Sequence, residues 1–396
     1  MNIAVADARI PSADELVERA RALIPMLRER ADEVEKARCV PKETIDAFKQ
    51  AGFFKILQPK RWGGWEMTPD VFWRVLMELG RGCGSSAWNM MILGVHQWEF
   101  GLMDPRAGDD VWAKDNTVLV ASSYAPFGTV TKVEGGYVLN GTWGTSSGTD
   151  HGDWAFIGVW LKDEQGRPIN RLALLVPRSD YEFLDDWFVF GLAGTGSKSL
   201  VLKNVFVPEH RAHSMIDYHL SDGADTYQFP FGMAFFGSVS AVMVGFAQGA
   251  IDIFIEQIKV RENINGCPQA ALDHYAKDRL GNAVVRVRSA RARILQVAAE
   301  AASYIARREL VPVDNRVHYT LDFARVGREC EEAVLLLYKA LSARGVFLSN
   351  PMQRVLRDTL VGANHITQNA DHNAEALGGY LLGQPLPPLM YGLPKA

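Results

Sequence analysis

Apolar residues recur every three to four positions over the first part of the chain, which is the period of a helix packed on one face. This spacing predicts helical structure over residues 12–51, 71–79 and 85–100, and the last of these segments is very apolar and rich in Trp and Met. Pro25 falls inside the first segment, where it is expected to kink the helix. Residues 1–115 are therefore predicted to form an N-terminal helical domain.

The pattern changes after residue 115 to short runs of β-branched and aromatic residues, separated by Gly-Gly, Asp-Glu-Gln-Gly and Pro-Arg-Ser-Asp turns. A middle β domain, a barrel or a sandwich, is predicted over 116–210. A polar, irregular loop follows over 211–232, and a loop of this length is typical of a lid or a substrate contact. The predicted strands are 117–123, 129–133, 137–139, 154–160, 172–176 and 199–207.

The helical period returns in the last part of the chain. Four long helices are predicted at 238–260, 272–307, 315–342 and 352–377. Four such helices in series are typical of a bundle, so residues 233–396 are predicted to form a C-terminal four-helix bundle. The fold class is α+β, mostly α, with the β domain between two helical parts.

Composition narrows the classes of function. The 396 residues carry a net charge of −4 and a sequence pI near 6.2, which gives no general attraction to nucleic acid or to an anionic membrane. The four cysteines are far apart and form no CxxC pair, as expected of a protein in a reducing cytoplasm. His210, His213 and His219 have no spacing typical of metal ligands, so no metal site is predicted.

Two hydroxyl-rich segments, 121–128 and 143–151, each lie beside aromatic residues and are joined by a predicted hairpin. Small hydroxyl residues let a backbone approach a flat ligand closely and supply hydrogen bonds to its polar edge. This combination suits the rim of a flavin better than an ordinary sandwich core. A polar β-turn at 146–148 is the alternative interpretation.

The chain resembles a known family over nearly its whole length. The helical–β–helical order is similar to that of the acyl-CoA dehydrogenase fold. Within that fold, specific strings resemble the oxygenase components of two-component flavin-dependent aromatic hydroxylases, such as those of p-hydroxyphenylacetate and secosteroid phenols. The matching strings are 57–59, 62–64, 94–98, 121–128, 143–151, 194–197 and 357–358 with His365.

The resemblance implies a reaction and its cofactors. Reduced FMN or FADH2 would come from a separate NAD(P)H:flavin reductase, and O2 would be the co-substrate. A C4a-hydroperoxyflavin would then hydroxylate a phenol or another electron-rich ring such as an indole. The absence of a GxGxxG motif after a strand agrees with a separate reductase. The resemblance also implies a homotetramer.

The same resemblance implies roles for individual residues. Ser147 would lie beside flavin N5, His96 would face the aromatic substrate, and His365 would orient or deprotonate the substrate hydroxyl. A buried core histidine is the alternative for His96, a plain turn for 194–197, and a solvated cation for Arg261. The remaining predicted substrate-binding residues are Ser122, Trp88 and Tyr124, and the predicted cofactor-binding residues are Ser123, Trp143, Ser146, Ser147, Gly194, Thr195, Ser197 and Arg261.

The region around His365 separates the possible reactions. Many acyl-CoA dehydrogenases carry a catalytic glutamate shortly after the Arg-Asp pair of this helix. Here Arg357 and Asp358 are followed by His365, and no carboxylate occurs until Asp371. An imidazole suits a phenol, whereas a carboxylate suits the removal of an acidic carbon-bound proton. A dehydrogenase or oxidase acting on an acyl thioester or a nitroalkane is the second hypothesis, and a non-catalytic binding protein is the third.

Overall fold

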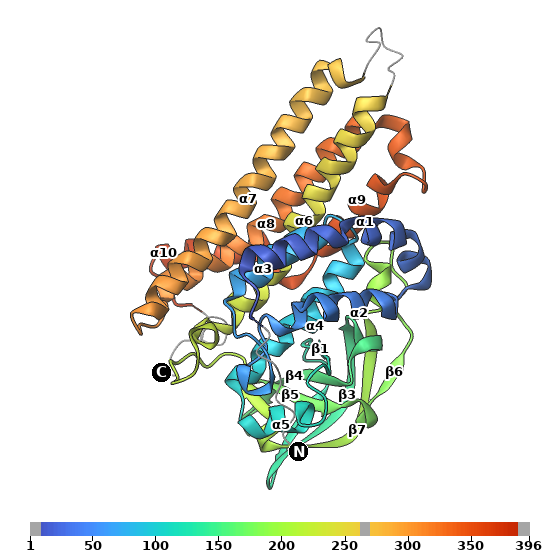
Figure 1. The fold of residues 1–396 in the computed structure, drawn as a ribbon. Helices are drawn as coiled ribbons and strands as arrows, with labels where there is room; N and C mark the ends of the chain where they lie inside the picture. The colour runs from blue at the N-terminus through green and yellow to red at the C-terminus, as the bar shows by residue number, and fades with distance from the viewer. Residues whose placement is uncertain (1–8, 262–269, 387–396) are drawn as a thin grey trace.

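The computed structural model describes residues 9–261 and 270–386, and its elements follow the predicted order of helices, strands and long helices (Figure 1). The chain has the acyl-CoA dehydrogenase fold, with its first helices lying between the β sheets and the C-terminal bundle (Figure 1). Helix α4 contacts both strand β1 and helix α6. It therefore joins the β domain to the bundle.

The N-terminal part begins where a capping box starts the first helix. The Ser12 hydroxyl accepts a hydrogen bond from the backbone N–H of Glu15, and the Glu15 carboxylate accepts one from the N–H of Ser12. Pro25 lies inside this helix and does not end it. The helices are α1 (Ala13–Ala37), α2 (Lys42–Ala51), α3 (Pro69–Leu79), α4 (Gly84–Glu99) and α5 (Pro105–Trp112), the last of which the sequence pattern did not predict.

The β domain consists of two four-stranded sheets, with strand orders β1-β4-β5-β8 and β2-β3-β7-β6. Strand β1 pairs in parallel with β4, and the other pairs are antiparallel. Trp143, Ile157 and Leu200 belong to the buried core of this domain. The strands are β1 (Val120–Ser123), β2 (Thr129–Val133), β3 (Gly136–Ser146), β4 (Trp154–Lys162), β5 (Pro168–Pro177), β6 (Glu182–Leu184), β7 (Lys198–Pro208) and β8 (Ala212–Ser214).

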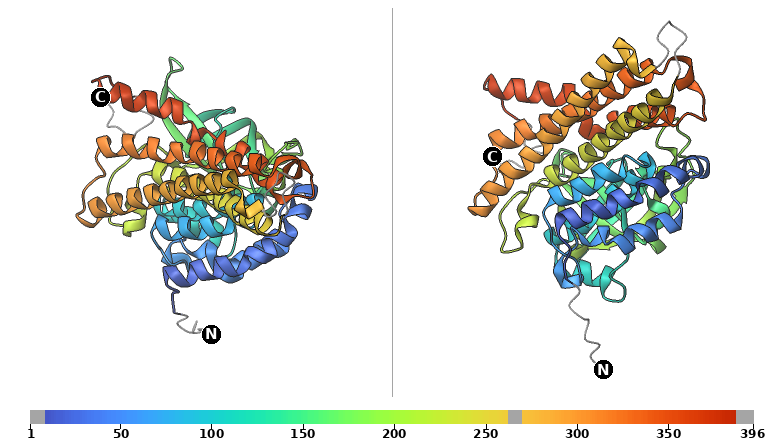
Figure 2. Two further views of the ribbon diagram at one scale, coloured as in Figure 1. Left: turned by 90° about the horizontal axis from the view of Figure 1, so that it is seen from above. Right: turned by 45° about the horizontal axis from the view of Figure 1, so that its top comes forward.

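The bundle differs from the prediction in its last helix. The segment predicted as one helix over 352–377 is broken into α9 (Pro351–Ala363) and α10 (Ala370–Leu381), and His365 lies in the break with extended backbone angles. The other long helices are α6 (Phe231–Val260), α7 (His274–Ala306) and α8 (Val313–Ala340), and Figure 2 shows them running alongside one another.

Helix α6 is long and apolar enough to cross a membrane by length and composition alone. In the structure, 83% of its most apolar stretch is buried inside the protein. It contacts α3, α7, α8 and α9. Its apolar character is therefore explained by its position at the centre of the bundle.

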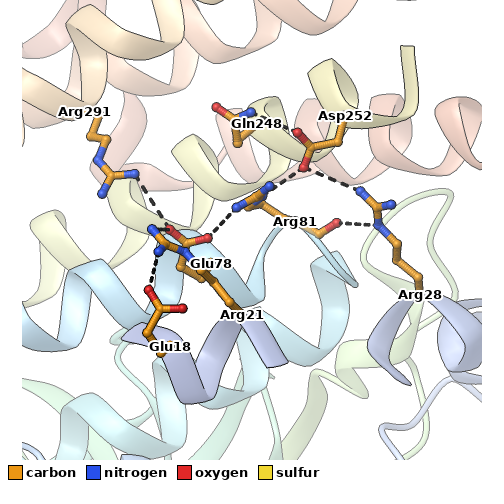
Figure 3. Close-up of polar contacts among 8 residues, drawn as sticks. All are labelled: Glu18, Arg21, Arg28, Glu78, Arg81, Gln248, Asp252 and Arg291. Carbon is orange, nitrogen blue, oxygen red and sulfur yellow. Dashed lines mark hydrogen bonds and ion pairs between the residues drawn. The ribbon is translucent and has the colours of Figure 1, made fainter. Parts of the chain in front are cut away.

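A network of ion pairs ties the first helices to the bundle (Figure 3). The Glu78 carboxylate at the end of α3 lies 3.1 Å from Arg21 on α1 and 2.6 Å from Arg81. Arg81 also contacts Asp252 on α6 at 2.8 Å, and Arg28 on α1 reaches the same carboxylate. Burial alone would raise the pKa of Glu78, but hydrogen bonds from the two arginines outweigh it and hold this pKa below its usual range.

Replacing Glu78 with alanine is expected to lower the free energy of unfolding by about 1–3 kcal/mol, because it removes a buried carboxylate from Arg21 and Arg81, which are partly exposed and keep only Glu18 and Asp252 as partners. Glu18 is the matched control, since it pairs with Arg21 but is 67% exposed where Glu78 is 2% exposed. Glu18→Ala is expected to cost less than about 1 kcal/mol. Urea unfolding of both variants measures the difference, and equal losses would contradict this account.

Candidate active site

A row of hydrogen-bonded hydroxyls lies where α4 meets the β domain. The Trp88 indole N–H donates to Ser147 Oγ at 3.2 Å, and the hydroxyls of Ser147 and Ser197 are 2.7 Å apart. Ser197 lies 2.7 Å from the hydroxyl of Thr195, which donates to the Leu192 carbonyl at 2.8 Å. We call this row the hydroxyl relay.

The direction of every proton in the hydroxyl relay is fixed by its two ends. An indole N–H can only donate and a carbonyl oxygen can only accept. Thr195 therefore accepts from Ser197, and Ser197 accepts from Ser147. The only proton of the Ser147 hydroxyl is committed, so toward a further group this oxygen can act only as an acceptor.

The loop that carries Thr195 and Ser197 is held from two sides. Asp358 on α9 accepts a hydrogen bond from the Leu192 N–H at 2.6 Å. Gly194 packs so closely on α1 that a Cβ there would lie 2.3 Å from a methyl group of Val34. Burial raises the pKa of Asp358 to about 7. Gly194, predicted to bind the cofactor, is thus required for a close backbone approach.

The end of β3 is irregular where it reaches the hydroxyl relay. The register with β7 shifts between Trp143 and Ser146, and the intervening Thr145 has a φ of +61°. A β-branched residue rarely adopts this conformation, and such strain concentrates at functional sites. The bulge leaves Ser146 Oγ buried and without a hydrogen-bond partner.

His365 lies in the break between α9 and α10, with its ring edge-on to Trp88 at a centroid distance of 5.6 Å. Its Nδ1 accepts from the backbone N–H of Thr367 at 3.3 Å and lies 2.9 Å from the Thr367 hydroxyl. Burial lowers the pKa of His365 to about 4. The ring is therefore neutral at pH 7 with its proton on Nε2, which makes Nε2 a donor.

His96 belongs to a second buried cluster, further along α4. Its Nδ1 lies 2.5 Å from the carboxylate of Glu99. The same carboxylate accepts from the Tyr124 hydroxyl and lies 2.7 Å from His213 Nε2 on β8. Trp88 and His96 are eight residues apart, or about 12 Å along the helix axis. The site therefore has two levels along α4. The first level is the hydroxyl relay with His365, and the second level is the cluster around His96.

Buried polar atoms without partners mark where a ligand with a polar edge fits. Among the described residues they include Asn89 Oδ1 and His96 Nε2, which helical spacing places on one side of α4. Ser146 Oγ on β3 is another. Buried polar groups are normally hydrogen-bonded, so these atoms are available to a bound molecule or to water. The sequence analysis did not single out Asn89, although a polar residue in so apolar a helix is a usable signal.

Comparison with known proteins identifies the family to which the chain belongs. Residues 11–101 match the model of the acyl-CoA dehydrogenase N-terminal domain, and residues 238–370 match that of the C-terminal domain. The oxygenase subunit HsaA of a flavin-dependent monooxygenase from Rhodococcus jostii is 35% identical, over 93% of this chain and 99% of the relative. The chain belongs to the family of flavin-dependent monooxygenase oxygenase subunits.

A second relative and a solved structure support the same family. The oxygenase component of p-hydroxyphenylacetate 3-hydroxylase from Acinetobacter baumannii is 30% identical, over 95% of this chain and 90% of its own. The crystal structure of 3-HSA hydroxylase from Rhodococcus sp. RHA1 superposes with a TM-score of 0.90 at 34% identity, covering 95% of this chain and 99% of that one. The predicted fold, enzyme class and family resemblance are confirmed.

The structure brings most of the predicted residues together at two levels of the flavin-dependent oxygenase. Ser147, Thr195, Ser197 and Trp88 meet in the hydroxyl relay beside His365. Tyr124 meets His96 at the second level, where the rings are edge-on at 5.6 Å. The roles assigned to these residues stay predictions.

Three predicted cofactor-binding residues make hydrogen bonds within the protein. Ser123, which is buried like its neighbour Ser122, donates its hydroxyl to the Gly144 carbonyl at 2.5 Å. The indole of Trp143 is fully buried in the β core, and its N–H donates to the Gly158 carbonyl. Arg261 ends α6, where it donates to the carbonyls of Ala340 and Leu341 at the end of α8.

The histidines of the 208–219 segment do not lie together in the structure. His210 pairs with Asp110 on α5, and His213 pairs with Glu99 on α4. Among residues 9–261 and 270–386, no group of three His, Cys, Asp or Glu residues is placed to hold a metal ion. The pairing of His213 with Glu99 was not predicted.

The raised pKa of Asp358 gives a prediction about stability. The folded carboxyl keeps its proton up to about pH 7, whereas an aspartate in the unfolded chain loses it near pH 4. Between these values the folded state binds more protons, so the free energy of unfolding falls as the pH rises, by about 2–4 kcal/mol. Asp358→Asn keeps an oxygen for Leu192 and removes this dependence.

Urea unfolding of wild type and Asp358→Asn at pH 5 and pH 8 measures the effect as a difference between the two proteins. His365 cancels in that difference, although its lowered pKa makes it act in the opposite direction. An equal pH dependence in both proteins would show that Asp358 is already ionised in the folded state.

Proposed function

We propose that this flavin-dependent monooxygenase hydroxylates a phenol, using O2 and reduced FMN or FADH2 delivered by a separate NAD(P)H:flavin reductase. The observation that carries the proposal is the placement of two buried imidazoles, with Nδ1 of His96 beside the Glu99 carboxylate and Nδ1 of His365 beside the Thr367 N–H, from which we infer opposite tautomers. His96 offers an acceptor and His365 offers a donor. Indoles and other electron-rich rings with an N–H or O–H group fit the same pair. We also propose a homotetramer, as the resemblance implies, and a cytoplasmic location, as the separated cysteines suggest.

The hydroxyl relay supports a reduced flavin at the level of Ser147. When bound, a reduced flavin supplies the electrons that activate O2. Its N5 carries a hydrogen, whereas N5 of the oxidised ring can only accept. Ser147 has an acceptor lone pair and no free proton, so it matches the reduced ring. Ser146 Oγ and Asn89 Oδ1 are further unpartnered groups for the polar edge of the flavin.

His96 supports a phenolic substrate at the second level. Its Nδ1–H is directed at the Glu99 carboxylate, so Nε2 holds a lone pair and accepts the substrate hydroxyl. The rings of Phe156 and Phe235 lie 5.7 and 5.4 Å from His96 and make its surroundings apolar. Ser122 on β1 is buried two positions before Tyr124, and we propose that it offers a further hydroxyl to the substrate.

His365 has a narrower role than the sequence suggested. With Nδ1 occupied by Thr367 and a pKa near 4, it is a hydrogen-bond donor at pH 7 and a poor base. This geometry favours the orienting role over deprotonation. Its contact with Trp88 supports a position beside the flavin that we propose at the level of Ser147.

The alternative function, a dehydrogenase, requires a catalytic base, and neither aspartate of α9 and α10 considered below is placed to act as one. Removal of an acidic carbon-bound proton requires a carboxylate near the flavin, and the first one after His365 is Asp371. The Asp371 side chain is 81% exposed and pairs with Arg328 on α8. Asp358 is buried but bonded to the Leu192 N–H. Oxidation of an acyl thioester or a nitroalkane is therefore disfavoured.

Ser197→Ala is expected to reduce the preference for reduced over oxidised FMN about tenfold, because Ser147 then has a free proton to donate to oxidised N5. Anaerobic titration with each form of FMN measures the two affinities. Ser199→Ala is the matched control, since the Ser199 hydroxyl donates to Asp186 outside the relay. An unchanged affinity ratio in Ser197→Ala would contradict the proposed proton direction.

The reaction is tested with ¹⁸O2, reduced FMN or FADH2, and a panel of phenols and their methyl ethers. Mass spectrometry is expected to find one ¹⁸O atom in a catechol, with the methyl ethers unreactive because they cannot donate to His96. Oxidation of an acyl thioester by the flavin-loaded protein, with no labelled product, would instead identify a dehydrogenase.

A further inference from the structure

The cluster around Glu99 contains more titratable groups than the proposed reaction uses. Glu99 is fully buried near the end of α4, and His213 on β8 is 6% exposed. The two residues are 114 positions apart in the sequence. A buried pair of titratable groups is costly to form, because its charges lose their hydration.

Counting protons fixes the state of each member of the pair. His213 Nδ1 lies 3.0 Å from the Ser214 carbonyl, which can only accept, so Nδ1 carries a hydrogen. His213 Nε2 lies 2.7 Å from Glu99 Oε2, and one proton lies between them. Burial raises the pKa of Glu99, but hydrogen bonds from His213 and His96 outweigh it and hold this pKa below its usual range. Glu99 is thus ionised, and His213 is an imidazolium.

The protonation of this pair determines the protonation of the two groups that contact the other oxygen of the Glu99 carboxylate. Glu99 Oε1 accepts from both Tyr124 and His96. Burial raises the pKa of Tyr124 well above its usual value, so its hydroxyl keeps its proton. One carboxylate balances one imidazolium, which leaves His96 neutral with its hydrogen on Nδ1. Its buried, unpartnered Nε2 is then an acceptor.

We propose that Glu99 and His213 are positioning residues that hold His96 as the acceptor for the substrate hydroxyl and stabilise the charge that His96 gains from it. This rests on the proposed phenol hydroxylation. The phenol O–H bond breaks, its proton forms a bond to His96 Nε2, and its electron pair stays on the phenolate oxygen. The new imidazolium faces the Glu99 carboxylate through Nδ1–H.

The pair also joins the site to the segment that follows the β domain. His213 lies on β8, which pairs with β5 just before that segment, so strand pairing delivers the imidazolium to α4. Other charged groups do not substitute for it. Arg171 on β5 donates to the Tyr124 carbonyl, and His210 pairs with Asp110 on α5.

The first test needs no substrate. Protein labelled with ¹⁵N at its nine histidines reports the protonation of each ring nitrogen by NMR. At pH 8 we expect one imidazolium, which disappears in His213→Gln and becomes neutral in Glu99→Gln, where the amide can donate to His213. Absence of any imidazolium in wild type would overturn the proposal.

The second test measures the ionisation of 4-nitrophenol bound to the full chain, by its phenolate absorbance. Glu99→Gln is expected to reduce the phenolate-to-phenol ratio about tenfold, because it removes the negative charge behind His96. His213→Gln is expected to act in the same direction, because without the hydrogen bond from His213 burial raises the pKa of Glu99 and the carboxyl takes up a proton. Asp110→Asn is the matched control, since it removes a carboxylate beside His210 outside the site. Asp110→Asn is expected to leave the phenolate-to-phenol ratio unchanged.

The outcomes separate this proposal from the proposed function. Wild-type protein that incorporates ¹⁸O into a phenol while both Gln variants ionise 4-nitrophenol as wild type does would overturn the positioning role alone. Failure of wild type to oxygenate any phenol would overturn the proposed function, and the NMR result would still decide the protonation of the pair.

Discussion

A carbonyl oxygen cannot donate a hydrogen bond, and the rest of the site depends on this constraint. The Leu192 carbonyl ends the hydroxyl relay and the Ser214 carbonyl ends the Glu99 cluster. From each carbonyl the direction of the protons follows, group by group. The relay ends in an acceptor at Ser147, and the cluster ends in an acceptor at His96. The chemistry of the site is thus set by backbone groups that do not titrate.

The fold holds these carbonyls in place from distant parts of the chain. The loop bearing Leu192 is fixed by α1 and by Asp358 on α9, while β8 brings Ser214 and His213 to α4. The ion pairs of Figure 3 connect α1, the end of α3 and α6 behind it. Loss of one of these contacts is expected to move the Leu192 or Ser214 carbonyl, and with it the direction of the hydrogen bonds that the carbonyl fixes.

Much of the molecule was predictable from periodicity, because helical and strand spacing differ clearly along the chain. The resemblance identified Ser147, Thr195, Ser197, His96 and His365. The break at His365 was missed because apolar residues keep a helical spacing through it. The burial of the Trp143 indole in the β core could not be predicted, because the register shift between Trp143 and Ser146 interrupts the regular alternation of side chains. The Glu99–His213 pair arises only from tertiary contact between distant segments.

We propose that Ser147 presents an acceptor, without a free proton, to N5 of the flavin. The midpoint potential of FMN bound to the wild-type protein tests this contact. We expect a potential above that of free FMN, by about 30 mV for each tenfold preference for the reduced form. A potential equal to or below that of free FMN would contradict it.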